Sequence, residues 1–185
     1  MRSALKFIAG AIVAGVLWQW GTPLYDAAIC RVVTPLLHVD SRLSGTVAER
    51  NGANVRVRRT DDLAFQNVEI PASELTYNVI LLGGLLAIRR GRPKAVAIAL
   101  ACFVLTHVLA FVVSIELMYA TRIPKWSDLH YSAHEQDFWT AAEYGYRLAG
   151  MFGIAFGAWW LSLPDDSLTP PETAPRAKRP RSQRA

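Results

Sequence analysis

The fold of this chain is decided by two apolar blocks on either side of a basic turn: YNVILLGGLLAI at residues 77–88, RRGRPK at 89–94 and AVAIALACFVLTHVLAFVVSIELMYA at 95–120. A helix needs about 20 apolar residues to cross a bilayer, and short loops rich in Lys and Arg stay in the cytoplasm. The stretch therefore predicts a transmembrane hairpin with a cytoplasmic turn.

Two further stretches complete a set of four predicted spans. Residues 5–24 are mostly apolar, and residues 141–163 are apolar apart from Glu143 and Arg147 near their start. Four spans place both termini on one side, where the remaining basic flanks also fall: Arg2, Lys6, Arg176, Lys178, Arg179, Arg181 and Arg184. We therefore expect an all-α, multi-pass protein of the bacterial inner membrane with both termini in the cytoplasm.

The composition supports this class of protein. The chain has 185 residues, of which 52% are hydrophobic, and a net charge of +5. Four spans take roughly 80 to 90 residues, which leaves no room for a large soluble catalytic domain. The basic residues stand where the topology needs them, so we do not expect nucleic-acid binding. The bulky Trp18-Gln19-Trp20 stands where a signal peptide would end in small residues, which indicates an uncleaved anchor.

The predicted organisation has four parts: an N-terminal anchor (1–24), an extracytoplasmic segment (25–76), a three-helix transmembrane region (77–163) and a basic cytoplasmic tail (164–185). The tail is rich in proline and charge and has no apolar face to bury. It is expected to be disordered, with its basic residues near anionic lipid.

The extracytoplasmic segment is predicted to contain a small β element. Residues 27–39 favour an interfacial helix because Pro35 interrupts the apolar run. Asn51-Gly52 lies between alternating stretches and predicts a β-hairpin, and a further short strand is expected over 65–70. The hairpin carries the candidate outer-face contacts Arg56, Arg58 and Arg59. They could bind an anionic headgroup or an acidic peptide, or could simply form a solvated strand face.

The second outer loop, residues 121–140, carries His130 and His134. In a helix these two side chains would stand one turn apart on one face, with Asp137 in reach, which is a spacing that zinc or copper could use. The ligand set is incomplete, and the aromatic neighbours favour an amphipathic interfacial segment instead. We therefore predict no metal and no cofactor.

Ionisable side chains within the predicted spans are few and form a candidate polar cluster: His107, Glu116, Glu143 and Arg147. Such groups are costly in a membrane and mark a polar seam or a partner contact. Glu143 and Arg147 are four residues apart, which predicts an ion pair, and Glu116 could join it from the neighbouring helix. The alternative interpretation is a structural clamp between helices.

The small residues and the two cysteines indicate less about function than the polar residues do. Gly83 and Gly84, and the small-xxx-small pair Gly153 and Gly157, favour close helix packing within a bundle or a homo-oligomer. The two cysteines, Cys30 and Cys102, are expected at different depths, which disfavours a disulfide. Cys30, with His38 two turns on, is the outer-face candidate for a catalytic thiol, but Pro35 falls between them.

Three motifs carry a family resemblance: Leu17-Trp18-Gln19-Trp20-Gly21-Thr22-Pro23, Tyr77-Asn78-Val79, and Phe138-Trp139-Thr140-Ala141-Ala142-Glu143-Tyr144-Gly145-Tyr146. With the layout of spans, they resemble the small membrane proteins that accompany exosortase H. The resemblance implies an accessory partner of an exosortase, a multispanning enzyme that processes C-terminal sorting tails of exported proteins. It carries over no catalytic residue.

The sequence therefore predicts an inner-membrane accessory protein that acts through lipid and protein partners in envelope protein sorting. Two alternatives stay open. One is a small membrane enzyme that uses Cys30, His38 or the pair His130 and His134. The other is a transporter or channel subunit with a polar path through His107 and Glu116.

Overall fold

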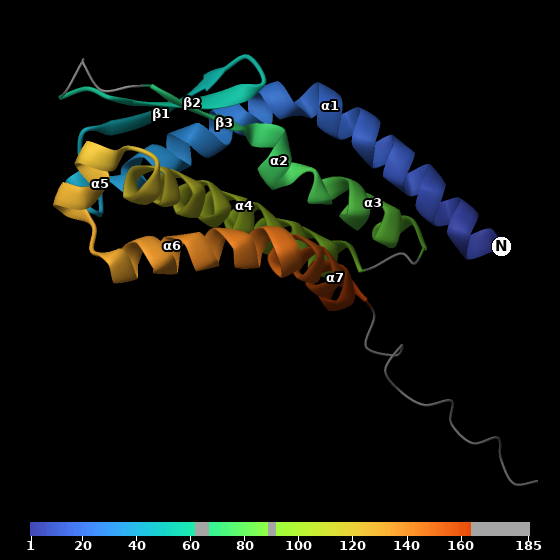
Figure 1. Cartoon of the computed structure of the whole chain (residues 1–185). Helices are drawn as coiled ribbons and strands as arrows, with labels where there is room; N and C mark the ends of the chain where they lie inside the picture. The colour runs from blue at the N-terminus through green and yellow to red at the C-terminus, as the bar shows by residue number, and fades with distance from the viewer. Residues whose placement is uncertain (62–66, 89–91, 164–185) are drawn as a thin grey trace, which may run out of the picture.

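The computed structural model describes residues 1–61, 67–88 and 92–163. Half of the predicted basic turn (89–91), the start of the predicted third strand (65–66) and the predicted tail (164–185) lie outside these residues. Over the described part, the chain is mostly helical and carries one small three-stranded sheet (Figure 1). The predicted combination of helices with a small β element is therefore confirmed.

The helical elements, including one 3₁₀ turn and one π-helical turn, are α1 (Arg2–Leu37), η1 (Ser41–Leu43), α2 (Ala72–Thr76), α3 (Asn78–Ile88), α4 (Pro93–Thr121), α5 (Pro124–His130), α6 (Ala133–Gly145), η2 (Tyr146–Gly150) and α7 (Met151–Ser162). Within the described ranges, α1 and α4 are long and apolar enough to cross a membrane, whereas Ala72–Ile88 is shorter. The path from α6 to α7 is divided by the π-helical η2. Length and composition thus support two of the four predicted spans.

One helix, α1, replaces the separate anchor and interfacial helix that were predicted for residues 1–39. The expected break does not occur, although Pro23 and Pro35 both lie inside the helix. The C-terminal part of α1 buries Ile29, Val33 and Leu37 in the core. Each such side chain contributes about 1.5–3 kcal/mol, which together offsets the roughly 3 kcal/mol of an interior proline.

The sheet is antiparallel, in the order β1-β2-β3, and consists of β1 (Thr46–Asn51), β2 (Asn54–Arg59) and β3 (Val68–Pro71). Gly52 has a φ of 63°, a backbone conformation that glycine adopts without strain. The predicted Asn51-Gly52 hairpin is therefore confirmed. Val55 and Val57 alternate into the core, where they join buried residues of α1 and α4.

The two ends of the molecule carry different elements (Figure 1). The start of α1, the end of α3, the start of α4 and the end of α7 lie together, and the sheet and α5 lie at the opposite end. The Arg92 N–H donates to the Ser162 carbonyl (3.2 Å), which holds the start of α4 beside the end of α7. We call residues 2–25 with α3, α4 and α7 the helical body, and the sheet with η1 and α5 the cap.

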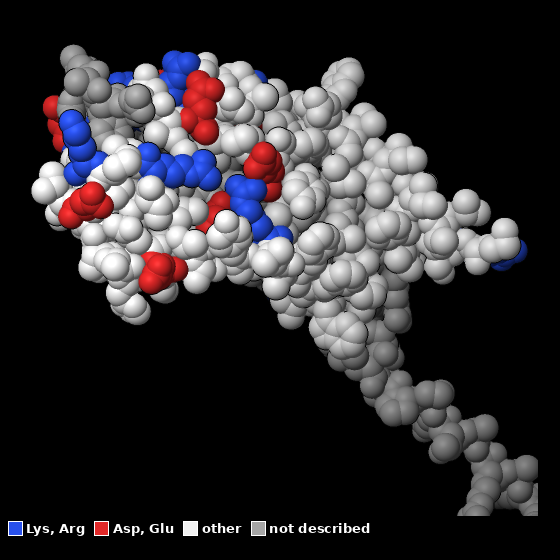
Figure 2. All heavy atoms as spheres, viewed as in Figure 1, with Lys and Arg blue, Asp and Glu red and all other residues white. Residues whose placement is uncertain are grey.

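The surface of the helical body is apolar. Figure 2 shows charged side chains gathered at the cap end, whereas the body presents almost none on this face. Large apolar side chains stand exposed along three helices of the body, among them Leu5, Ile8, Ile12, Leu17, Leu24, Ile98, Leu105, Leu109, Phe152, Phe156 and Trp160. A surface of this extent is typical of a face that contacts lipid or protein rather than water.

Glycine lets α1 and α3 approach closely. A Cβ on Gly83 would collide with Ala14 of α1, and a Cβ on Gly10 would come within 2.8 Å of the Gly83 carbonyl oxygen. The predicted packing role of Gly83 is therefore confirmed. Gly153 and Gly157 differ, because nothing described lies within 4 Å of a Cβ built on either. Their predicted close approach is not made within this chain.

Candidate functional sites

The predicted ion pair between Glu143 and Arg147 is present. Arg147 Nε donates to Glu143 Oε1 at 2.7 Å, and its Nη1 donates to Glu74 Oε2 at 2.8 Å. Glu143 is buried, and its other oxygen accepts from the Ser114 hydroxyl at 2.7 Å. The group thus connects α2, α4 and the junction of α6 with η2. Sequence reasoning missed Glu74 and Ser114, which are far from Arg147 along the chain.

Glu116 belongs to a different contact, so its predicted place beside Glu143 and Arg147 is wrong. Its Oε2 accepts from the Tyr131 hydroxyl at 2.8 Å, and both side chains are buried. Glu116 follows Ser114 by two residues, so the turn of α4 directs the two side chains to different sides of the helix. Burial raises the pKa of the Tyr131 phenol, which keeps it a neutral donor.

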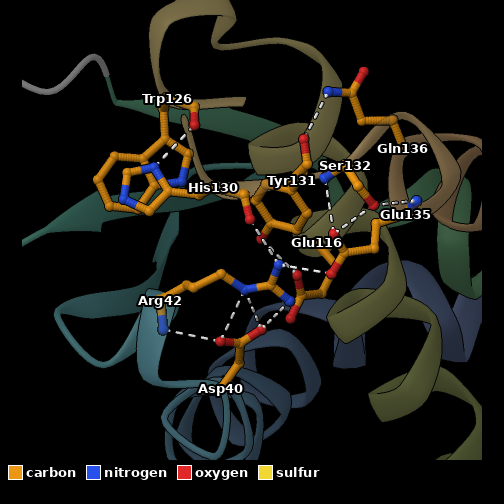
Figure 3. Close-up of polar contacts among 9 residues, drawn as sticks. All are labelled: Asp40, Arg42, Glu116, Trp126, His130, Tyr131, Ser132, Glu135 and Gln136. Carbon is orange, nitrogen blue, oxygen red and sulfur yellow. Dashed lines mark hydrogen bonds and ion pairs between the residues drawn. The ribbon is translucent and has the colours of Figure 1, made fainter. Parts of the chain in front are cut away.

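A second polar group, centred on Arg42, lies in the cap (Figure 3). Arg42 Nη2 pairs with Asp40 Oδ2 at 2.6 Å, and Nη1 donates to Glu135 Oε1 at 3.0 Å and to the His130 carbonyl at 2.9 Å. The guanidinium also lies over the Tyr131 ring, 4.2 Å from its centroid. One side chain thus ties η1 to the segment that joins α5 and α6.

Electrostatics reinforce this arrangement. Hydrogen bonds from Arg42 hold the pKa of the Asp40 carboxyl below its usual range. The pKa of Glu135 is also lowered, first by hydrogen bonds from Ser132 and then by Arg42. Ser132 and Glu135 form a capping box at the start of α6, whose S-x-x-E spacing is readable in the sequence. The pairing of Glu135 with Arg42 cannot be read from the sequence, because the two residues are far apart along the chain.

The predicted histidine pair is separated by a helix end. His130 closes α5, whereas His134 lies in α6 beyond the N-cap Ser132, so the two do not share a helix face. The His130 ring stacks on Trp126, with centroids 3.8 Å apart, and its Nδ1 donates to the Trp126 carbonyl at 3.0 Å. Among the described residues, no cluster of three His, Cys, Asp or Glu side chains suits a metal ion.

His107 stands at the centre of a buried chain of hydrogen bonds through the helical body. Asn78 Nδ2 donates to the Met151 carbonyl at 3.2 Å, so its Oδ1 faces His107 Nε2 at 2.8 Å and accepts from it. His107 Nδ1 is then left to accept the Tyr25 hydroxyl proton, at 2.5 Å. This series of hydrogen bonds joins α1, α4, α3 and α7 through neutral groups. It does not include Glu116.

The three hairpin arginines have unequal environments. Arg56 pairs with Glu69 at 3.2 Å and Arg58 with Glu49 at 3.3 Å, on the exposed face of the sheet. Arg59 is buried instead: it pairs with Asp61 and lies over the Trp126 ring, 4.1 Å from the centroid. Only Arg56 and Arg58 are therefore placed to meet a partner. The expectation for Arg59 as an outer-face contact is wrong because its guanidinium helps to pack α5 on the sheet.

The candidate catalytic thiol is not assembled. Cys30 is 5% exposed and packs in the core beneath the sheet. His38 Nε2 donates to the Thr46 carbonyl at 2.8 Å, which commits this ring to the backbone of β1. Asp26, one turn before Cys30, is fully buried, and neither of its carboxylate oxygens has a hydrogen-bond partner among the described residues. The His38 contact holds α1 beside β1, and no described residue supplies a base that is hydrogen-bonded to the Cys30 thiol.

Comparisons of the chain with family models, with curated proteins and with solved structures find no match in any of the three searches.

Proposed function

We propose that this chain is a four-span protein of the bacterial inner membrane, with cytoplasmic termini, that acts by binding a protein partner at its outer face. The partner class that we propose is a membrane enzyme of envelope protein sorting, such as an exosortase. The partner is suggested by the resemblance of the motifs around Trp18, Asn78 and Trp139. The membrane placement is suggested by the physical properties of the surface.

The observation that carries the proposal is the separation of an apolar helical body from a charged cap. The body exposes large side chains on α1, α4 and α7, and the hydrogen-bond chain through His107 in its interior consists of neutral groups. The cap packs on the C-terminal halves of α1 and α4 through a hydrophobic core and exposes ion pairs on the sheet. This division is typical of a protein whose body lies in lipid and whose cap meets water.

The arrangement supports binding better than the two alternatives. For an enzyme, the candidate nucleophile Cys30 is buried and the histidines His38 and His130 are bonded to backbone carbonyls. For a proton path, His107 and Glu116 would have to be connected, yet each is bonded to other residues. The exposed pairs at Arg56 and Arg58 remain available to an acidic surface on a partner.

The topology is tested by labelling single cysteines in whole cells with a maleimide that does not cross membranes. Starting from a parent without native cysteines, Cys30→Ser with Cys102→Ala, Glu49→Cys in the cap is expected to react, and Lys94→Cys at the start of α4 is expected to react only after the cells are opened. Labelling of Lys94→Cys in intact cells would overturn the proposed orientation.

The partner is tested by purifying the tagged chain from cells in mild detergent and identifying bound proteins by mass spectrometry. A sorting enzyme is expected to accompany the wild type and to be depleted from a double variant, Arg56→Glu with Arg58→Glu. The matched control is Arg31→Glu, an exposed arginine of α1 outside the sheet. Repeated isolation of the folded wild-type chain alone would contradict the proposal.

A further inference from the structure

A polar cleft opens where α2, α4 and α6 meet. It consists of two hollows of about 440 and 330 Å³, and both are lined by Glu74, Leu117, Arg122, Glu143 and Arg147. Because the ion pair of Arg147 with Glu74 lines both hollows, they are two compartments of one cleft. Their combined size falls within the range of small-molecule sites, about 300–1,000 Å³.

The cleft holds unused hydrogen-bonding groups of both signs. Arg122 is exposed at the end of α4, and its guanidinium has no partner among the described residues. Among the described residues, Arg147 uses Nε and Nη1 for its two carboxylates and has no partner at Nη2, and Glu74 uses Oε2 and has no partner at Oε1. Glu143 differs because both of its oxygens are occupied. The cleft therefore offers two cationic donors and one anionic acceptor.

The position of the cleft indicates the kind of ligand. On one side lies the charged cap, and on the other the exposed apolar side chains Leu148 and Phe152 continue down the helical body. In the proposed membrane placement, on which this inference rests, the cleft stands at the level of the outer lipid headgroups. A ligand whose polar end carries both charges and whose tails are apolar would satisfy both sides at once.

We propose that this cleft binds the phosphoethanolamine headgroup of a membrane phospholipid. The phosphate accepts hydrogen bonds from Arg122 and from the free Nη2 of Arg147, since guanidinium groups match phosphate oxygens in charge and geometry. The ammonium group donates to Glu74 Oε1. The acyl chains then lie along the apolar surface beside Leu148. Phosphatidylglycerol would satisfy the arginines but leave Glu74 Oε1 without a cationic donor.

The experiment is native mass spectrometry of the full chain released from detergent micelles, after titration with phosphatidylethanolamine, phosphatidylglycerol or free phosphoethanolamine. Phosphatidylethanolamine is expected to bind most tightly. Arg122→Gln should weaken that binding about tenfold, which is the effect of one lost charge-assisted contact. Glu74→Gln should remove the preference for phosphatidylethanolamine over phosphatidylglycerol.

Arg31→Gln is the matched control, because it removes an exposed arginine of α1 that lies outside the cleft, and it should bind lipid as the wild type does. Unfolding temperatures without added lipid show whether each variant is folded. Equal binding by folded Arg122→Gln and wild type would overturn the site. Equally tight binding of free phosphoethanolamine would overturn the assignment to a lipid. Neither result depends on whether a protein partner is found, so the two proposals fail separately.

Discussion

The cap and the helical body each rely on a different kind of internal polar contact. In the cap, Arg42 joins Asp40 and Glu135 through ion pairs whose side chains are between 23 and 43% exposed. In the body, His107 joins Tyr25 and Asn78 through neutral hydrogen bonds, with His107 only 1% exposed. Both arrangements tie together elements that are distant in sequence, but only one of them uses charge.

The difference follows from the surroundings of each group. Water near the cap stabilises charges that are not fully neutralised, so an ion pair there costs little to form and contributes modestly. In a low-dielectric body an unpaired charge is expensive, whereas a neutral donor matched to a neutral acceptor is not. The two regions should therefore respond differently to mutation, to salt and to pH.

The largest loss of stability is expected when helix packing in the body is disrupted. Gly83→Ala places a methyl group against Ala14 and forces α1 and α3 apart, which should destabilise the protein by about 2–3 kcal/mol. Thermal unfolding in detergent measures the loss. Gly153→Ala is the control, because its Cβ would meet open space. Equal stability of the two variants would contradict the close contact.

The second largest loss of stability is expected when the neutral hydrogen bonds of His107 in the body are removed. His107→Leu leaves the Tyr25 hydroxyl and the Asn78 carbonyl oxygen buried without their partner, and we expect a loss of about 2 kcal/mol. Unfolding of this variant should show the same loss at low and at high salt. Cys102→Ala, an exposed change on the same helix, should leave stability unchanged. A salt-dependent loss would mean that His107 is charged.

A smaller effect is expected in the cap. Arg42→Gln removes the ion pair with Asp40 and the contact over Tyr131, and it should cost about 1 kcal/mol at low salt. At about 1 M salt, where the screening length is about 3 Å, the difference from wild type should shrink. Denaturant unfolding at the two salt concentrations gives this comparison. A loss as large and as salt-independent as that of His107→Leu would erase the distinction between the regions.

The smallest effect is on pH dependence. The pKa of Asp40 is lowered in the folded state, so its contribution to stability is fully present above its unfolded value, about 4, and is lost as pH falls through the folded value. Wild-type stability should therefore decline over this acidic range, and Arg42→Gln should decline less. Unfolding temperatures between pH 6 and acid conditions, roughly pH 3, measure both slopes. Parallel slopes would show that Arg42 does not control Asp40.

Local patterns allowed part of this structure to be predicted. The hairpin follows from Asn51-Gly52, because the turn needs a residue that accepts positive φ. The Glu143–Arg147 pair follows from its spacing of four residues on a helix. The prolines of α1 misled the prediction, because tertiary burial of Ile29 and its neighbours outweighs a local break. His130 and His134 misled it for the opposite reason, because a capping box at Ser132 starts a new helix between them.

By itself, the sequence determined which stretches are apolar, where charge accumulates and where the chain can turn, because hydropathy, helix spacing and turn chemistry act over a few residues. Only the tertiary structure decided which polar side chains meet. Glu116 joined Tyr131 rather than Arg147, and Arg42 reached Glu135 across 93 residues of chain. Such contacts depend on how whole helices are rotated and packed, and no local spacing encodes that geometry.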